Sequence, residues 1–184
     1  MDKESLRKLL LKLGFENEII DDILVFADNE IDAKYLYEKI KYLAELKCTD
    51  RIIRIIIEEN PIFLNTEFEN IKDVINYLKE KDLDDYIVNI LEVNPYILSV
   101  SLDKIKNNEK ILGYLLNEDN LRNVFINRSE LLTYNNDFLT NRIRLLVENN
   151  LKDKISRIII TNPEIFELED DEINIKELKV KFKV

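Results

Sequence analysis

Three Asn-Pro dipeptides recur along the chain at a regular interval, and this repeat constrains the fold more than any other feature. They are Asn60-Pro61, Asn94-Pro95 and Asn162-Pro163, separated by 34 and then by 68 residues. Because 68 is twice 34, a fourth copy is expected near residue 128, where Asn127-Arg128 keeps the asparagine and has arginine in place of proline. A period of about 33–35 residues is typical of helical solenoids, in which each unit buries its apolar face against the next.

Apolar residues stand seven, four and three positions before each asparagine of the three Asn-Pro pairs, and this spacing predicts one buried helix face. The nine residues are Ile53, Ile56, Ile57, Ile87, Ile90, Leu91, Ile155, Ile158 and Ile159. Proline has no N–H and restricts the residue before it, so each helix should end at or before the asparagine. The apolar triplets that follow, such as Ile62-Phe63-Leu64, are expected to fill a corner between helices.

The turn before each of these helices also repeats. Phe15, Cys48, Leu83 and Leu151 occupy the same place in four of the units, five residues after a leucine that closes the preceding helix. Gly14 is expected to be the C-cap of the first helix. Cys48 is therefore expected to be a small buried hydrophobe and not a nucleophile.

The predicted fold is an all-α solenoid of about four stacked repeats of 33–35 residues, forming one domain over residues 1–184. The expected segments are an N-terminal cap at 1–28, units at 29–60, 61–94, 95–127 and 128–162, and a C-terminal cap at 163–184. At the C-terminus, Ile175, Leu178 and Phe182 favour a closing helix. The alternation of Leu178, Val180, Phe182 and Val184 leaves open a short strand, whose edge would be able to pair with a partner.

Composition bears on location and partners. No apolar run approaches the ~20 residues of a membrane-spanning helix, and the first residues lead into an amphipathic segment, so we expect a cytoplasmic protein that does not enter a membrane. The formal net charge is −10. Residues 1–100 carry 22 acidic and 13 basic side chains, whereas residues 101–184 carry 15 and 14. This balance opposes binding to nucleic acid and favours a protein partner with a basic surface.

The chain lacks the residues of common reaction centres. It has no histidine, and its two glycines, Gly14 and Gly113, cannot build a phosphate-binding loop. The acidic runs at 82–85 and 167–172 lack the spacing of a calcium loop and are expected to be helix caps and solvated turns. The eight tyrosines are expected mostly to pack in the core. We therefore predict a non-enzymatic protein with no catalytic residue, no metal site and no cofactor.

The repeat resembles that of the mitochondrial transcription termination factor (mTERF) family. The segment from Ile90 to Leu102, with Asn94-Pro95 at its centre, carries the resemblance most clearly, and Leu10 to Leu24 is similar to half of that family's repeat. The resemblance covers roughly residues 9–168. It implies units of two longer helices and one short one, stacked into a curved, left-handed superhelix whose concave side holds nucleic acid.

The family grips phosphates through arginine and lysine, and this chain departs from that pattern in its acidic first half. The candidate nucleic-acid-binding residues are Arg122, Arg128, Arg142, Arg144, Lys152, Lys154 and Arg157, although a solvated helix surface explains them as well. The expected repeat corners, by contrast, are structural: Asn60, Pro61, Asn94, Pro95, Asn127, Asn162 and Pro163.

Two functions follow as hypotheses, and the sequence leaves the oligomeric state open. The first is a helical-repeat interaction protein that binds a macromolecule, a protein in preference to a nucleic acid, through a curved acidic surface. In one form of this hypothesis the chain is an inhibitor that mimics nucleic acid and occupies the cationic groove of an enzyme. The alternative is an mTERF-like nucleic-acid-binding protein that uses a basic patch in the C-terminal half.

Overall fold

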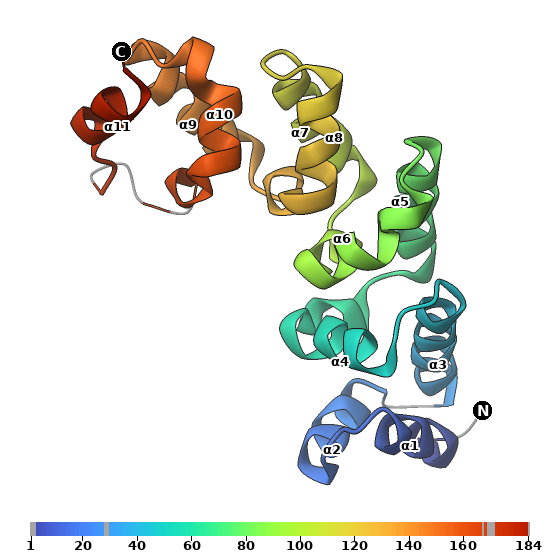
Figure 1. The fold of residues 1–184 in the computed structure, drawn as a ribbon. Coiled ribbons are helices and arrows are strands. Elements are labelled where there is room, and N and C mark those ends of the chain that lie inside the picture. Colours follow the sequence, from blue (N-terminus) through green and yellow to red (C-terminus); the bar gives the residue numbers. More distant parts are fainter. Residues whose placement is uncertain (1–2, 28–29, 167, 169–171, 184) are drawn as a thin grey trace. The chain divides into compact units, whose positions relative to one another are not determined.

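The computed structural model describes residues 3–27, 30–166, 168 and 172–183, and every regular element in these ranges is a helix (Figure 1). The predicted all-α class is thus confirmed. The chain divides into two compact units, unit 1 (Met1–Leu102) and unit 2 (Asp103–Val184), and each is described by itself. The single domain and its segment boundaries stay a prediction. Among the described residues, no helix combines the length and the apolar character needed to cross a bilayer.

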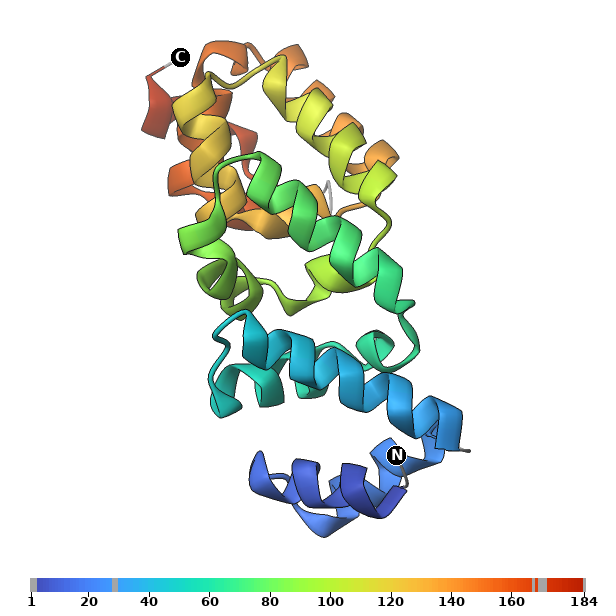
Figure 2. The same cartoon turned by 90° about the vertical axis from the view of Figure 1, so that its right-hand side faces the viewer.

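Unit 1 consists of helices joined by short 3-10 turns. Its elements are α1 (Lys3–Lys12), α2 (Asn17–Phe26), α3 (Glu30–Glu45), α4 (Asp50–Glu59), η1 (Pro61–Asn65), α5 (Phe68–Glu80), η2 (Asp84–Tyr86), α6 (Ile87–Val93) and η3 (Pro95–Ser99). In Figure 2, α1 (dark blue), α3 (blue) and α5 (green) form successive layers. Because α1 packs on α3, α4 on α6 and η1 on η3, each segment contacts its counterpart in the next repeat.

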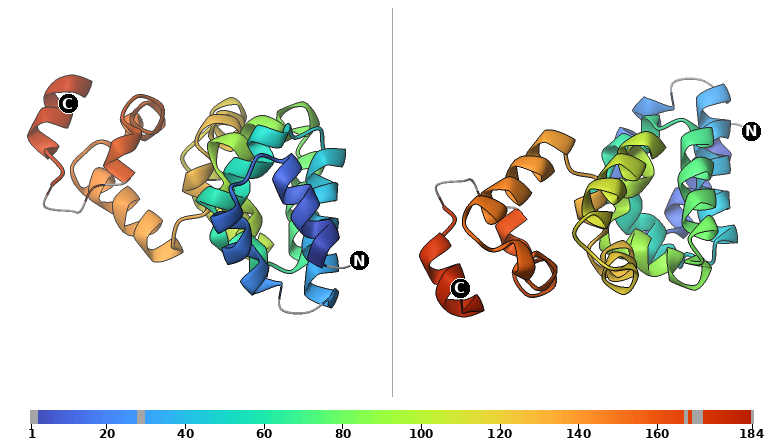
Figure 3. Two further views of the ribbon diagram at one scale, coloured as in Figure 1. Left: turned by 90° about the horizontal axis from the view of Figure 1, so that it is seen from below. Right: turned by 90° about the horizontal axis from the view of Figure 1, so that it is seen from above.

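Unit 2 continues the same order of elements. They are α7 (Leu102–Gly113), α8 (Glu118–Asn127), η4 (Ser129–Leu132), α9 (Asn136–Glu148), η5 (Lys152–Lys154), α10 (Ile155–Thr161), η6 (Pro163–Phe166) and α11 (Ile175–Phe182). Figure 3 shows α11 in red beside α10 in orange, and the Arg157 guanidinium of α10 lies 5.6 Å from the centre of the Phe182 ring of α11. The preferred C-terminal helix is confirmed over residues 175–182. Leu178 and Phe182 are buried four residues apart while Val180 is 80% exposed, which is helical and not strand periodicity. Val184 of the strand alternative lies outside the described residues.

The predicted buried face of the short helices is confirmed. All nine apolar residues of α4, α6 and α10 that the repeat selects are buried. In α4, which carries Ile53, Ile56 and Ile57, Ile52 joins them in the core. These helices therefore bury apolar surface in their repeats, and such burial is the main source of stability in stacked repeats.

Each Asn-Pro pair ends a helix and begins a 3-10 turn, as predicted. The asparagines are C-caps with non-helical backbone, at φ −127° for Asn60 and −142° for Asn94 and Asn162. Their N–H groups still donate to the carbonyl four residues earlier, in Ile56, Ile90 and Ile158. Proline then occupies the first position of the 3-10 turn, where a missing N–H leaves no bond unmade.

The structure corrects the third corner by one residue. Asn127 is the last residue of α8 and is exposed, so it is not the counterpart of the other asparagines. Arg128 is the C-cap, at φ −143°, and its N–H donates to the Val124 carbonyl at 2.9 Å. Ser129 is the counterpart of the prolines because it begins η4, and its side chain is fully buried. Arginine thus replaces asparagine, serine replaces proline, and the 34-residue period holds through residues 60, 94, 128 and 162.

This register predicts opposite effects for proline at two neighbouring positions. Ser129→Pro should change the free energy of unfolding by less than about 1 kcal/mol, because that position begins a 3-10 turn. Arg128→Pro should lower it by about 2 kcal/mol or more, because it removes the bond to Val124 and places a ring against that carbonyl. Urea unfolding of the two variants checks this. An equal loss in both would show that the third corner has a different register.

Helices α1, α3, α5 and α9 share one type of C-terminal end. A residue in the left-handed region follows each helix, at φ between 55° and 87°, namely Gly14, Lys47, Asp82 and Asn150. The next residue in each case donates its N–H back to a leucine carbonyl five residues earlier, from Phe15, Cys48, Leu83 and Leu151. This is the bonding of a Schellman end. The predicted equivalence of these four residues, and the C-cap role of Gly14, are confirmed.

Four long helices each insert one polar side chain beneath the next corner. Lys39 donates to the carbonyls of Phe63 and Leu64, Asn70 to Leu98 and Val100, Asn108 to Leu132 and Tyr134, and Arg142 to Leu168. Asn108 and Arg142 are 34 residues apart, and so are their acceptors Tyr134 and Leu168. These bonds satisfy carbonyls at the ends of 3-10 turns, which lack partners within the turn. We call Lys39, Asn70, Asn108 and Arg142 the corner donors; Asn70 is half-buried and the other three are buried.

Candidate functional site

The structure distributes the seven predicted basic residues over several elements of unit 2. Arg122 lies on α8, Arg128 at the corner before η4, and Arg142 and Arg144 on α9. Lys152, Lys154 and Arg157 lie together on η5 and the first turn of α10, with Lys154 and Arg157 about one helical turn apart. Only this last group is brought together by its local structure.

Arg142 is not a surface residue, so the prediction that it contacts nucleic acid does not fit its position. Its side chain is 1% exposed. The guanidinium donates to the Leu168 carbonyl and lies 5.1 Å from the centre of the Phe138 ring. Arg142 belongs to the corner donors, and its role is to hold the corner that follows α10.

The remaining basic residues have partners of their own or are exposed. Arg128 is half-buried and lies 4.0 Å from the Glu130 carboxylate. Arg144 is exposed and donates to the Asn141 side-chain oxygen at 2.8 Å. Lys152 and Arg157 are exposed as well. Of the seven predicted residues, the exposed ones are therefore Arg122, Arg144, Lys152 and Arg157, whereas Arg128 and Lys154 are half-buried.

In unit 1 the arginines are already paired with carboxylates, so they are poorly placed to bind a phosphate. Its three arginines are Arg7, Arg51 and Arg54, and each is ion-paired with a carboxylate, of Asp21, Glu92 and Glu58 respectively. Four lysines, Lys8, Lys34, Lys41 and Lys72, have acidic partners within 3.8 Å. The acidic residues are in excess, so the surface of unit 1 remains negative.

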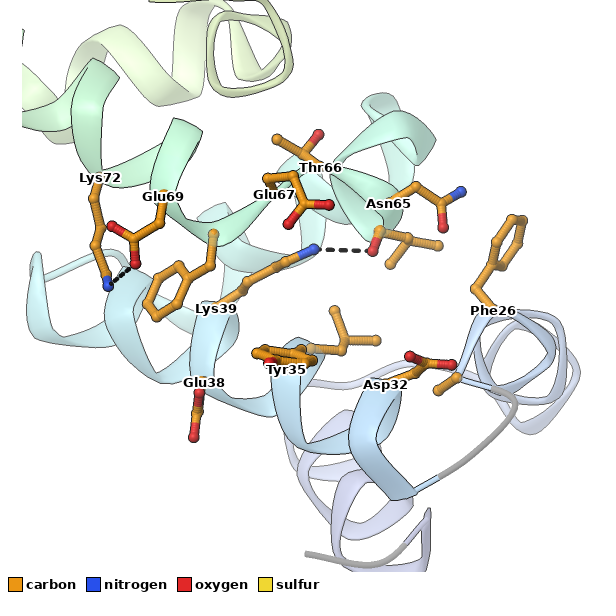
Figure 4. A pocket seen from close by; sticks show the side chains of 14 residues that line it. Phe26, Asp32, Tyr35, Glu38, Lys39, Asn65, Thr66, Glu67, Glu69 and Lys72 are labelled. Atoms are coloured by element: carbon orange, nitrogen blue, oxygen red, sulfur yellow. Dashed lines mark hydrogen bonds and ion pairs between the residues drawn. The ribbon is translucent and has the colours of Figure 1, made fainter.

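A pocket of about 550 Å³ opens in unit 1. Its walls are the end of α2, one side of α3, the η1 corner and the first turn of α5. Figure 4 shows Tyr35, Asp32 and Phe26 along one rim and Glu67 and Asn65 along the other. We call this site the acidic pocket, because its lining includes Asp32, Glu38, Glu67 and Glu69 against two lysines, Lys39 and Lys72.

Both lysines of the acidic pocket are held on acceptors of unit 1. The Lys39 ammonium donates to the Phe63 and Leu64 carbonyls at 3.2 and 3.0 Å, and burial lowers its pKa, while the Glu67 carboxylate opposes that shift. Lys72 lies 2.7 Å from Glu69, and this hydrogen bond raises the pKa of the Lys72 ammonium. Neither ammonium is directed at an incoming anion.

No motif in the sequence indicated this pocket. The prediction that the tyrosines pack mostly in the core is wrong for four of the eight. Tyr35, Tyr86, Tyr96 and Tyr114 are exposed, whereas Tyr77 is buried as expected. The buried face of α3 carries Ala33, Leu36, Ile40 and Leu43, and Tyr35 lies off this spacing, one residue before Leu36. Helical periodicity could therefore have predicted that Tyr35 lies outside the core.

The described residues give little support to covalent or metal chemistry. Burial raises the pKa of the Cys48 thiol to about 11, so the thiolate is scarce near neutrality. The predicted burial of Cys48 is confirmed. Within the described ranges, no group of three or more histidine, cysteine or acidic side chains is arranged to hold a metal ion. Of the predicted acidic run at 167–172, residues 167 and 169–171 lie outside these ranges.

Comparison with known proteins agrees with the repeat. Residues 3–170 match the family model described as mTERF, which spans both units. No curated protein matches the chain closely enough to count as a relative. The matched range includes all four corners at 60, 94, 128 and 162, and with them the helices that each corner joins. This protein is therefore a member of the mTERF family.

Proposed function

We propose that this protein is a non-enzymatic binding protein whose acidic unit 1 recognises a basic surface on a protein partner. The observation that carries the proposal is the charge of residues 1–100, where 22 acidic side chains face 13 basic ones. Such an excess attracts cationic surfaces over several ångströms and speeds their association. It also repels the phosphates of a nucleic acid.

The pairing of cations in unit 1 supports the same proposal. Each of its arginines is ion-paired, and a phosphate would have to displace a carboxylate to reach it. Exposed carboxylates such as Asp22, Glu59 and Asp85 are spread over α2, α4 and η2. A partner that presents lysine and arginine can pair with these groups.

One class of partner has the required charge by its own function. Enzymes that act on nucleic acids carry cationic grooves, and an acidic repeat that occupied such a groove would exclude the substrate. In this form of the proposal the protein is an inhibitor that imitates the charge of nucleic acid.

Affinity capture tests the proposal. The tagged full-length chain is incubated with lysate of its native cell, with and without nuclease, beside an Asp22→Asn, Glu59→Gln, Asp85→Asn variant. We expect a captured protein that survives nuclease and is lost with the triple variant. Capture that depends on intact nucleic acid would contradict the proposal.

Family membership favours a second candidate function, nucleic-acid binding through unit 2. The exposed residues that we propose for it are Arg144, Lys152 and Arg157, on α9, η5 and α10. Under this candidate, labelled duplex DNA or single-stranded RNA binds at ~50 mM salt and much more weakly at ~200 mM, since each phosphate contact releases counterions. Reversing the charge of all three residues would abolish the binding. An absence of binding at both salt concentrations removes this candidate.

A further inference from the structure

We propose that the acidic pocket of unit 1 binds an arginine side chain of the protein partner. This rests on the proposed function and adds the chemical group that is recognised. The pocket volume of about 550 Å³ falls within the range of sites that enclose small molecules, and it can hold a long side chain with part of its backbone. Its walls come from four elements of unit 1, so the fold of that unit sets its shape.

The charge of the lining selects a cation. Of the four lining carboxylates, Glu69 pairs with Lys72, and Glu38 pairs with Lys34 and points away from the cavity (Figure 4). Asp32 and Glu67 then stand against Lys39 alone, which leaves an excess of one negative charge. Lys72 is bound to Glu69 and lies 4.3 Å from the centre of the Phe68 ring, and Lys39 is held on two carbonyls. A phosphate entering the pocket would meet Asp32 and Glu67, and a guanidinium would meet the same groups as partners (Figure 4).

The aromatic rings of the rim narrow the choice to arginine. Tyr35 is 53% exposed and Phe26 is 50% exposed, although large aromatic side chains are usually buried. A planar guanidinium stacks on such rings and forms two parallel hydrogen bonds with a carboxylate, here Asp32 or Glu67. A lysine ammonium does neither as well, because it is a compact and strongly hydrated point charge.

The test uses the ¹⁵N-labelled full chain and capped five-residue peptides, Gly-Gly-Arg-Gly-Gly and its lysine, glutamine and glutamate counterparts. We expect the arginine peptide to cause saturable chemical-shift changes at the amides of the pocket residues. The lysine peptide should bind several-fold more weakly, and the other two should cause no change. Shifts scattered over the whole acidic surface, or equal affinity for the arginine and lysine peptides, would overturn the assignment.

Variants locate the binding within the pocket. Tyr35→Ala removes an exposed ring and Asp32→Asn removes a carboxylate, and each should raise Kd about fivefold or more. Asp73→Asn is the matched control, because Asp73 is an exposed carboxylate of α5 outside the pocket. Equal weakening by the control and by Asp32→Asn would show attraction by net charge alone and contradict the proposal.

The outcomes separate the pocket from the proposed function. If a protein partner is captured and binds the Tyr35→Ala and Asp32→Asn variants as well as the native chain, the pocket assignment is wrong and the proposed function stands. If the arginine peptide binds the pocket and no protein partner is captured, the proposed function is wrong and the pocket assignment stands.

Discussion

Replacing Arg142 by alanine is expected to lower the free energy of unfolding by about 3–5 kcal/mol. The side chain is 1% exposed, donates to the Leu168 carbonyl and packs on the Phe138 ring. Alanine would leave a cavity in α9 and a corner carbonyl without its donor, and both changes destabilise the folded state. Urea unfolding followed by circular dichroism measures the loss.

Arg144→Ala is the control for this prediction. Arg144 lies two residues away on α9, is exposed and donates to the side chain of neighbouring Asn141. Its removal should change stability by no more than about 0.5 kcal/mol. Equal losses in the two variants would show that Arg142 is a surface residue and would restore it to the basic patch.

Ile90→Ala is expected to cost about 2–5 kcal/mol. Ile90 is fully buried on α6, the short helix that packs on α4 of the preceding repeat. Its removal empties space between two repeats, and rigid helices cannot close that space without moving their other contacts. Thermal and urea unfolding of the variant give the magnitude.

Val93→Ala, on the same helix, provides the comparison. Val93 is 47% exposed, so its truncation should cost less than about 1 kcal/mol. A melting temperature unchanged by Ile90→Ala would mean that the buried face of α6 is another face, and that the repeat had been read in the wrong phase.

The short helices and their corners could be predicted from the sequence because two local rules agree there. Apolar spacing marks the buried face of α4, and proline marks its end at Asn60. The third corner lacks proline, and aligning Asn127 with the other asparagines placed this corner one residue too early. The period alone, counted from Asn94, leads to Arg128. The 34-residue period thus located this corner more reliably than the asparagine did.

The burial of Arg142 could also have been predicted, from the helical periodicity of α9. It falls on the face of α9 that carries Leu139, Ile143 and Leu146, so helical periodicity places it inside. Composition instead suggested a phosphate contact, because arginine is rarely buried without a partner. Its partner, the Leu168 carbonyl, is 26 residues away, and backbone acceptors carry no mark in a sequence.

The acidic pocket could not be predicted. Its walls are contributed by residues from 26 to 72 on four elements, and no motif links them. Tyr35 and Phe26 look like core residues until the packing of α2, α3 and η1 is known. What the sequence did provide was the sign of the charge in this half of the chain.

The central claim is that acidic unit 1, and not the basic residues of unit 2, recognises the partner. Calorimetric titration of the captured partner against three forms of the full chain tests it most directly: native, Asp22→Asn with Glu59→Gln and Asp85→Asn, and Arg144→Glu with Lys152→Glu and Arg157→Glu. We predict affinity reduced about tenfold or more by the first set of changes, and unchanged or increased by the second. Affinity that survives the first set and is lost with the second would contradict the claim.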